Sequence, residues 1–467
     1  MSEIADLDAI STARLVSSGE ISASEAVSAA FRRIEERKEL NAFITLCEER
    51  ARKEAGAADA ARKRGDEIGP LHGVPFSVKD LTNTEGVPTS QGSALFAGKV
   101  PDADAIAVAR ARATGAILIG KTTTPEFGHK PFTEGPYFGR TLNPWDHGRT
   151  CGGSSGGGAV AVATGMGALA LGSDGGGSIR IPASCCGVTG LKATLGMVPN
   201  LQAPDLFGAN SFVGPMARNI ADLSYFFDVL AGHDRRDPYG QGDTIASRYH
   251  DGRVRIALLL RCGNILDPQV ERRVLDAMSH AGELGIDVEE IDLDLVSLEG
   301  AFLVILRSAL LSRLTTAIER TPHLLDPTLV STAEAGRAYS AVDLWEANYA
   351  RTRCFATVQK IFERYDLIAS PTLSAPPLPV NTDPLGRIEI DGKDAGTIRG
   401  AWYPYTFPFN LTGHPALSMP CGLTHEGLPV GLQLVARWNE DRFLLDVAAR
   451  FEEAIAFTAK PREFSDA

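Results

Sequence analysis

Two serines in glycine-rich loops are the residues of this chain whose types and spacing could carry out acyl transfer. Ser154 lies in residues 153–156 (GSSG), and Ser178 closes residues 173–178 (SDGGGS). Glycine at this density weakens helices and strands, so it indicates a positive φ or a close approach of the backbone to another group. The N–H groups of residues 175–178 could therefore converge on an anion, such as the oxyanion of an acyl-transfer reaction.

A serine nucleophile needs a base, and the pattern around Lys79 points to this lysine. Residues 74–80 (VPFSVKD) alternate in polarity, which predicts a half-buried strand with Lys79 at its end. Burying a charged lysine there costs free energy unless the residue has a catalytic role or a charged partner. The alternative to a catalytic role is that Lys79 forms a structural ion pair with Asp80. Burial disfavours the charged form of lysine, and the neutral amine can accept a proton. Lys79 is therefore the candidate base.

Three other patterns suggest different chemistry. Residues 115–122 (GAILIGKT) match the phosphate-binding P-loop, but residues 116–119 read as a buried strand rather than as a loop. Residues 152–157 satisfy the GxSxG pattern of a nucleophile elbow twice, yet the turn-rich residues 143–148 precede them where an elbow requires a strand. His414 is the candidate for a Ser-His-Asp triad, although a histidine in a turn before proline is more often structural. A P-loop protein and a Ser-His-Asp hydrolase remain as the weaker alternatives.

The composition favours a cytoplasmic enzyme that acts on a small molecule. The chain has 467 residues, with 46 basic and 58 acidic side chains and a formal net charge of −12, and no cluster of Lys and Arg argues for a nucleic-acid partner. Its seven cysteines are odd in number and show no CxxC spacing, so we expect neither a disulfide framework nor a metal site, and no other cofactor. The start of the chain is acidic, unlike a signal peptide, and no apolar run approaches about 18 residues, so we expect no membrane partner.

Hydrophobic periodicity predicts alternating helices and strands along the chain. The helix expected over residues 159–171 would connect the two serine loops, and a capping box at Ser22 and Glu25 would open an earlier helix. Residues 295–364 are mainly helical and carry no motif of their own. Further helices are expected over residues 50–64, 103–114, 268–284 and 441–455, strands over residues 41–46, 116–119, 255–260, 288–293, 366–370, 416–420 and 430–436, and a hairpin over residues 387–393.

Taken in order, the motifs of this chain resemble those of the amidase signature family. Each motif alone is modest, but their order along the chain is highly specific. The similarity covers nearly the whole chain and is weakest over residues 295–364. The motifs that carry it lie at residues 78–80 (VKD), 120–127, 143–145 (NPW), 152–157 (GGSSGG) and 172–183 (GSDGGGSIRIPA), and it continues at residues 187–192, 409–416 and 427–433.

The resemblance implies a fold and a set of site residues. The fold is α/β, with a mixed twisted central β-sheet flanked by helices on both faces, in a single domain over residues 1–467. Residues 65–200 are expected to hold the catalytic core, and the helical residues 295–364 to cover the active site. Family members use a Ser-cisSer-Lys triad, which makes Ser178 the nucleophile, Ser154 the bridging serine on a cis peptide and Lys79 the base. The implied oxyanion and substrate-binding residues are Gly175, Gly176, Gly177 and Gly128.

The resemblance also implies the activity. It predicts an amidase that hydrolyses a C–N amide bond of a small molecule to a carboxylic acid and an amine or ammonia, through an acyl-enzyme on Ser178. The alternatives are a glutamine-hydrolysing subunit of a tRNA-dependent amidotransferase and a carbamate or aryl-acylamide hydrolase. Gly175 departs from the family pattern, because a threonine is frequent there. Aromatic residues expected at the mouth favour an apolar acyl or aryl group: Phe127, Phe132, Tyr137, Phe138, Trp402, Tyr403 and Tyr405. A homodimer is an open possibility.

Overall fold

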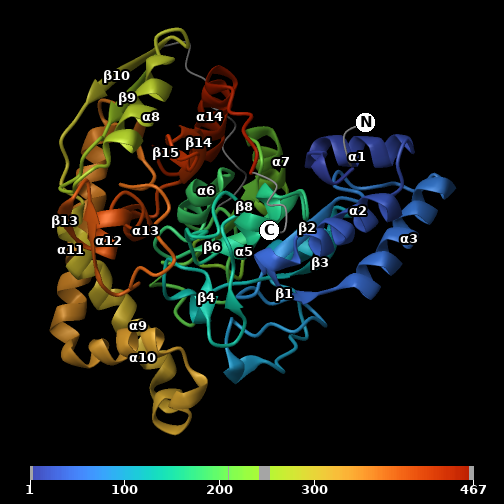
Figure 1. The fold of residues 1–467 in the computed structure, drawn as a ribbon, viewed down its shortest axis with the longest axis horizontal. Coiled ribbons are helices and arrows are strands. Elements are labelled where there is room, and N and C mark those ends of the chain that lie inside the picture. The colour runs from blue at the N-terminus through green and yellow to red at the C-terminus, as the bar shows by residue number, and fades with distance from the viewer. Residues whose placement is uncertain (1–3, 209, 241–252, 462–467) are drawn as a thin grey trace.

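A mixed sheet of eleven strands runs through the molecule (Figure 1). The computed structural model describes residues 4–208, 210–240 and 253–461. Neighbouring strands are parallel in some pairs and antiparallel in others. In spatial order the strands are β1 (Phe43–Leu46), β3 (Ile117–Thr122), β2 (Pro75–Lys79), β6 (Leu169–Asp174), β8 (Phe212–Ala217), β7 (Thr189–Lys192), β14 (Ala416–Leu423), β15 (Pro429–Ala436), β11 (Leu367–Pro371), β9 (Val254–Leu258) and β10 (Ile286–Glu290).

Helices pack against both faces of this sheet, as expected for the α/β class. On one face, α4, α7, α8 and α14 share an apolar core with the strands. On the other face, α2, α5 and α6 contribute to a second core. The bounds of these helices and their neighbours are α1 (Ala9–Ser18), α2 (Ala23–Glu36), α3 (Glu48–Arg64), α4 (Ile106–Ala113), α5 (Gly156–Ala163), α6 (Arg180–Cys186), α7 (Ile220–Leu230), α8 (Pro268–Ser279) and α14 (Asp441–Ile455). The capping box predicted at Ser22 and Glu25 is present at the start of α2.

Strand β2, which ends at Lys79, lies in the interior of the sheet between the parallel strands β3 and β6. Every residue of β2 is buried, so the prediction of a half-buried strand is wrong. The reason is that parallel neighbours are covered by helices on both faces. Phe76 and Val78 join the core on the α4 and α7 side. Because strand side chains alternate, Ser77 and Lys79 point to the opposite face, where α5 lies.

The segment between the two serine loops is a helix followed by a strand, so the prediction of one helix over residues 159–171 is wrong. Helix α5 ends at Ala163, and β6 begins at Leu169. Gly165 between them has a φ of +74°, and a Cβ at this position would lie 2.7 Å from the backbone oxygen of Ala5. The backbone therefore turns out of the helix at Gly165. A run of small apolar residues suits a buried strand as well as a buried helix, so the sequence pattern could not separate the two.

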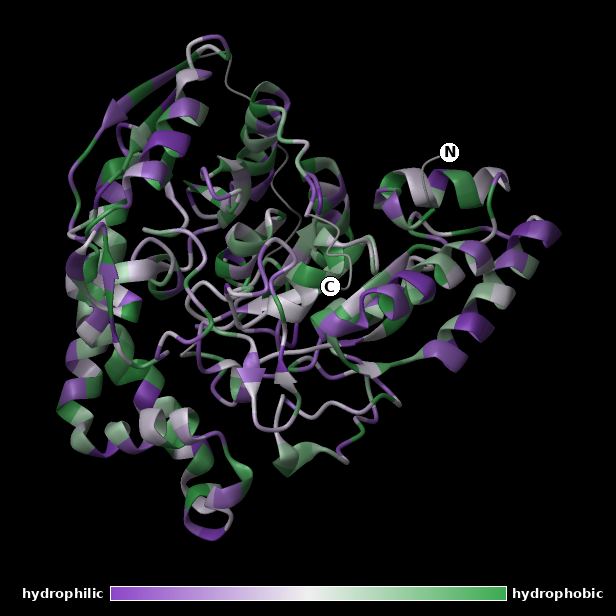
Figure 2. Ribbon diagram, viewed as in Figure 1, coloured by the Kyte–Doolittle hydropathy of each residue, from purple (hydrophilic) through white to green (hydrophobic). Residues whose placement is uncertain are grey.

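The helical segment expected over residues 295–364 is present as α9 (Glu299–Arg320), α10 (Pro327–Glu334) and α11 (Ala341–Phe362), at one end of the molecule in Figure 1. Helices α10 and α11 both pack against α9. Leu310 of α9 and Leu329 of α10 belong to one small apolar core, and Phe302 of α9 packs with Phe407 and Leu411 in another. Figure 2 shows hydrophobic and hydrophilic residues interspersed along these helices.

Within the described residues, one helical stretch, Val296–Arg320, is long and apolar enough to cross a membrane by length and composition alone. This stretch is not an unbroken apolar run, because Arg307 and Arg313 interrupt it. Several of its apolar residues have partners inside the fold, because they contact α10 and line the cavity described below.

The remaining predicted elements are largely present. Strands β9 and β10 pair in parallel with α8 between them along the chain, which confirms the predicted βαβ unit. The predicted hairpin is formed by β12 (Arg387–Ile390) and β13 (Lys393–Thr397), which pair antiparallel. Two short helices follow the hairpin, α12 (Ile398–Trp402) and α13 (Pro408–Thr412), and they lead the chain into β14 at the centre of the sheet.

Candidate active site

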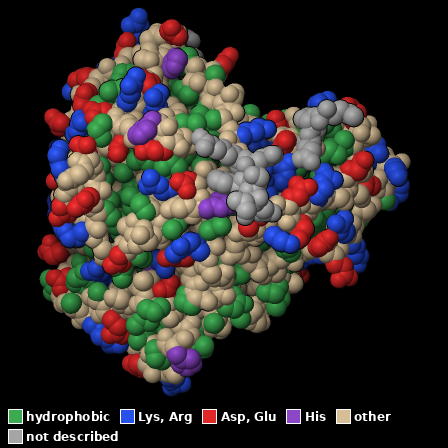
Figure 3. Space-filling model, in the orientation of Figure 1, with side chains coloured by type: hydrophobic (Ala, Val, Ile, Leu, Met, Phe, Trp, Pro, Cys, Tyr) green, Lys and Arg blue, Asp and Glu red, His purple; other side chains and the backbone are tan. Residues whose placement is uncertain are grey.

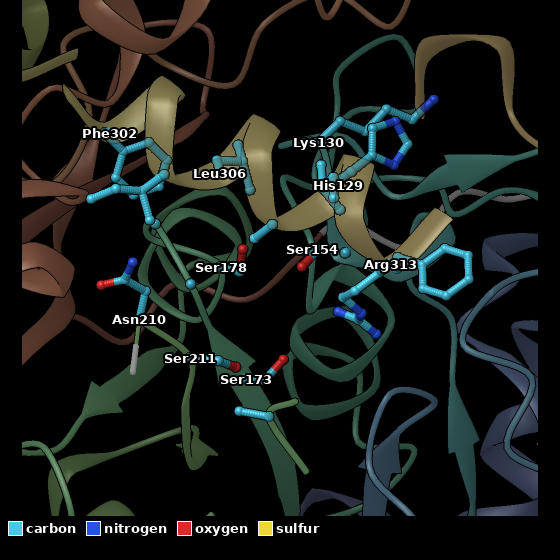
Figure 4. A pocket seen from close by; sticks show the side chains of 18 of the residues that line it. His129, Lys130, Ser154, Ser173, Ser178, Asn210, Ser211, Phe302, Leu306 and Arg313 are labelled. Carbon is cyan, nitrogen blue, oxygen red and sulfur yellow. The ribbon is translucent and has the colours of Figure 1, made fainter. Parts of the chain in front are cut away.

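A cavity of about 540 Å³ lies between the two serine loops and helix α9. Ser154 and Ser178 both line it, and Figure 4 shows their side chains on its wall. The other lining residues include 127–131, 203–205, 208, 210, 211 and the inner face of α9. The structure thus brings the two predicted serines to one cavity, and helix α9 of the helical segment forms one of its walls.

Lys79 lies beneath these serines, fully buried at the end of β2. Its Nζ donates hydrogen bonds to Ser154 Oγ at 2.7 Å, to Ser155 Oγ at 2.9 Å and to the backbone oxygen of Ser173 at 3.3 Å. The alternative that Lys79 pairs with Asp80 is wrong. The Asp80 carboxylate instead lies 3.9 Å from Lys121 and accepts hydrogen bonds from Ser90.

The electrostatic environment of Lys79 favours its neutral form. Burial lowers the pKa of Lys79 to about 7, although the negative charge of Asp174 acts in the opposite direction. Lys79 takes part in no ion pair among the residues that the structure describes. A free lysine has a pKa of about 10.4. A large fraction of Lys79 is therefore neutral near pH 7, and a neutral amine can take a proton from a hydroxyl group.

Ser154 and Ser155 begin the turn that leads into α5. The peptide bond between Gly153 and Ser154 is cis, as the family resemblance implies. Ser155 is a contact of Lys79 that the sequence reasoning missed: its hydroxyl accepts from Lys79 Nζ and donates to the backbone oxygen of Ser173 at 3.1 Å. Its N–H also donates to the backbone oxygen of Ser178 at 3.0 Å, which ties the two serine loops together. The doubled GxSxG pattern was the signal for this second serine, since it places two hydroxyls side by side.

Ser178 is half-buried and its side chain faces the cavity (Figure 4). The Ser178 hydroxyl makes no hydrogen bond to another described residue. Lys79 and Ser154 are hydrogen-bonded directly. Ser178 lines the same cavity as Ser154, and its backbone oxygen accepts a hydrogen bond from the N–H of Ser155. Hydrogen bonds between catalytic groups often become short only when a substrate is bound. The arrangement therefore leaves Ser178 exposed to a substrate and Lys79 shielded from water.

A buried ion pair holds the loop that carries Ser178. The Asp174 carboxylate accepts from the N–H groups of Gly177 at 2.6 Å and Ile179 at 3.2 Å, and from Arg180 Nε at 2.9 Å. Arg180 in turn donates to the side chains of Asn410 and Gln433 at 2.7 and 2.8 Å. Burial acts to raise the pKa of Asp174, but the Arg180 guanidinium outweighs it and keeps the pKa below its usual range. These contacts fit the scaffold role expected for this pair.

The four predicted glycines differ in what their N–H groups can do. Gly177 donates its N–H to Asp174, and Gly128 donates its N–H to the backbone oxygen of Pro125 at 2.8 Å, so neither is available to an oxyanion. The N–H groups of Gly175, Gly176 and Ser178 have no acceptor among the described residues. Gly128 serves the site by its size instead, because a Cβ there would lie 3.0 Å from Ser154 Oγ.

The aromatic residues expected at the mouth divide into two groups. Phe127 and Tyr403 line the cavity. Phe132 and Trp402 stack on each other in the core, with ring centroids 5.9 Å apart, and Tyr405 is also buried away from the cavity. Tyr137 and Phe138 lie outside the lining as well. The expectation that all seven surround the mouth is therefore wrong, and the prediction missed Phe302, a cavity residue on α9 that has no motif around it.

The residues of the two alternative sites are buried elsewhere. Lys121 lies on β3, where its Nζ donates to the backbone oxygen of Thr82 at 2.5 Å and to Thr89 Oγ1 at 2.8 Å, so the P-loop match is a strand. His414 is enclosed by the rings of Phe355 and Phe362, and burial lowers its pKa to about 3. Neither residue lines the cavity. Both alternatives are therefore wrong for this site.

Residues 25–445 match the protein family described as Amidase. The chain belongs to the amidase family. It is 33% identical to an acylamidase of Rhodococcus erythropolis, over 96% of this chain and 95% of that protein. It is 35% identical to a glutamyl-tRNA(Gln) amidotransferase subunit of Symbiobacterium thermophilum, over 94% and 95% of the two chains. The crystal structure of a bacterial aryl acylamidase of the amidase signature family has a TM-score of 0.89 and 27% identity, covering 96% of each chain.

These similarities confirm the amidase signature fold and identify this amidase-family protein as a hydrolase of C–N bonds in amides. They do not separate a free-standing amidase from a glutamine-hydrolysing subunit, because the two sequence relatives have nearly the same identity. That choice depends on the cavity of this amidase. In the described residues, no group of three or more His, Cys, Asp or Glu side chains could hold a metal ion.

The ion pair beneath the Ser178 loop yields a stability prediction. Asp174→Asn leaves the Arg180 guanidinium buried without a carboxylate, and breaking a buried pair in this way costs about 3–5 kcal/mol. Denaturant unfolding should therefore show a large fall in the unfolding midpoint. The control is Asp66→Asn, which breaks an exposed pair with Arg64 and should leave the midpoint almost unchanged. Equal midpoints for Asp174→Asn and the unmodified protein would contradict the assigned role of this pair.

Proposed function

We propose that this protein is a free-standing amidase in which Ser178 is the nucleophile, Ser154 relays protons and Lys79 is the base. The observation that carries the proposal is the 2.7 Å hydrogen bond between Lys79 Nζ and Ser154 Oγ, in a buried site where the pKa of Lys79 is lowered to about 7. The base is thus next to a hydroxyl on the wall of the cavity that also holds Ser178.

The reaction proceeds through an acyl-enzyme. Neutral Lys79 takes the proton of Ser154 while Ser154 takes the proton of Ser178, and Ser178 Oγ forms a bond to the carbonyl carbon of the amide. The N–H groups of Gly175, Gly176 and Ser178 stabilise the oxyanion, since they have no acceptor among the described residues. The same relay returns a proton to the nitrogen as the C–N bond breaks. Water then hydrolyses the ester of Ser178 by the same route and releases the acid.

A free-standing hydrolase is favoured over a glutamine-hydrolysing subunit by the cavity itself. Phe127, Phe302 and Tyr403 give it apolar walls, which suit an aryl or alkyl amide better than glutamine. Aryl acylamides and carbamates remain candidate substrates of the same site. Turnover of an anilide by the purified protein alone supports this choice, whereas ammonia release from glutamine only with added partner subunits contradicts it.

The proposal includes a cytoplasmic location and no nucleic-acid partner. All seven cysteines are free and buried, which suits a reducing compartment. On the face drawn in Figure 3, acidic and basic side chains are interspersed rather than gathered by sign.

The serine roles are tested by substitution and by labelling with a fluorophosphonate. Ser178→Ala should lose labelling and lower kcat/KM for an anilide by about 10⁴-fold or more, since it removes the nucleophile. Ser154→Ala should approach this loss. Ser155→Ala should cost about tenfold, because it removes one of the two hydroxyls that hold Lys79 Nζ. Labelling that persists in Ser178→Ala and disappears in Ser154→Ala would reverse the two roles.

The pH dependence of activity tests the base. Lysine loses its proton as the pH rises, and only the neutral amine accepts a proton, so kcat/KM should rise through a pH of about 7 and then level off. Lys79→Ala should slow amides more than activated esters, because an amide nitrogen needs the returned proton to leave. Chelators should have no effect. Near-normal amide turnover by Lys79→Ala would show that the base is another group.

A further inference from the structure

Two arginines line the cavity, and neither has its charge matched by the protein. Arg399 lies on α12, beside the loop that carries Ser178, and Arg313 lies on α9. Among the described residues, neither guanidinium has an ion-pair or hydrogen-bond partner. The Arg399 guanidinium is partly buried, where an unpaired charge is costly, so it has unused capacity to bind an anion, whereas the Arg313 side chain is exposed.

Arg399 is the more firmly held of the two. Its guanidinium carbon lies 4.7 Å from the ring centroid of Phe302 and 5.1 Å from that of Tyr403. Its Nη1 lies 3.4 Å from the point where a Cβ on Gly176 would stand, which places it beside the loop that carries Ser178. Contacts with aromatic rings fix a guanidinium while leaving its N–H groups free to bind a ligand. The rings of Phe302 and Tyr403, which line the cavity, therefore position the Arg399 guanidinium.

The carboxylates near Arg399 form no ion pair with it among the described residues. Glu299 accepts hydrogen bonds from Thr397 Oγ1 at 2.6 and 2.8 Å. Asp205 is the one acidic residue among the described cavity-lining residues, and its side chain is exposed. Its carboxylate accepts a hydrogen bond from the N–H of Phe207. The remaining lining cation, Lys130, is neutralised by Asp326 at 2.9 Å. The cavity therefore presents a net positive charge to its substrate.

We propose that the amide hydrolysed at this site carries a carboxylate and no ammonium group, and that Arg399 binds this carboxylate. The inference rests on the proposed hydrolysis at Ser178. A planar guanidinium binds a carboxylate through two parallel hydrogen bonds, which orients the substrate as well as holding it. An ammonium group, as on the α-carbon of glutamine, would find no buried carboxylate among the described lining residues.

The first experiment compares anilides that differ only in charge. Valeranilide is neutral, glutaranilic acid adds a carboxylate at the far end of the acyl chain, and L-γ-glutamylanilide adds an ammonium to that acid. Acetanilide and 4-acetamidobenzoate form the matching pair with the carboxylate on the amine side. We expect kcat/KM to be about tenfold or more higher for the carboxylate member of one pair, and L-γ-glutamylanilide to be poorer than glutaranilic acid. A preference for the neutral member of both pairs overturns the proposal.

The second experiment assigns the effect to Arg399. Arg399→Gln should lower the charged-to-neutral ratio of kcat/KM by about tenfold or more, and Arg399→Lys should retain part of it because it keeps the charge. The control variant is Arg64→Gln, which removes an exposed arginine at the end of α3 and should leave the ratio unchanged. A ratio that falls in Arg313→Gln but not in Arg399→Gln overturns the role of Arg399.

A binding measurement separates this inference from the proposed catalysis. In a Ser178→Ala background, calorimetry should show that glutaranilic acid binds about tenfold or more tightly than valeranilide, and that adding Arg399→Gln removes the difference. This readout needs no turnover, so it stands even if Ser178 is not the nucleophile. Equal affinity for both anilides, together with equal turnover of both, overturns the proposal.

Discussion

A lysine buried without an ion pair is the constraint on which the rest of this structure depends. Lys79 ends a strand in the interior of the sheet, where the covering helices exclude water, and its Nζ contacts two hydroxyls and a backbone oxygen. These neutral acceptors satisfy its hydrogen-bonding capacity without stabilising its charge as a carboxylate would. The same burial that makes the charged form costly therefore favours the neutral amine near pH 7, as the proposed role of Lys79 as the base requires.

A second constraint is that the glycine-rich loop that carries Ser178 must be held in one position. Asp174 and Arg180 connect the loop of Ser178 to Asn410 and Gln433, which come from the C-terminal part of the chain. The carboxylate accepts the N–H of Gly177, while the N–H groups of Gly175, Gly176 and Ser178 have no acceptor among the described residues. The position of Ser178, the proposed nucleophile, is thus set by contacts between segments far apart in the sequence, while the glycines supply the space.

Local patterns predicted most elements, and the misses have physical causes. The capping box of α2, the βαβ unit and the hairpin were predicted because their signals are short-range. The strand β6 was predicted as helix, because small apolar residues fit either element once both are buried. Motifs singled out Lys79, Ser154 and Ser178, which the structure brings together, whereas the contact of Ser155 with Lys79 and the places of Phe302 and Arg399 in the cavity wall were missed because they arise only when distant segments meet.

The most direct test of the account is the protonation state of Lys79 itself. Carbon-13 NMR of the protein labelled at lysine Cε can follow each amine with pH, and the resonance of Lys79 is identified as the one missing from Lys79→Met. The account predicts that this resonance titrates at a pH of about 7, since burial lowers the pKa of Lys79 to that value. Titration above a pH of about 9, close to the value for an exposed lysine, would contradict it.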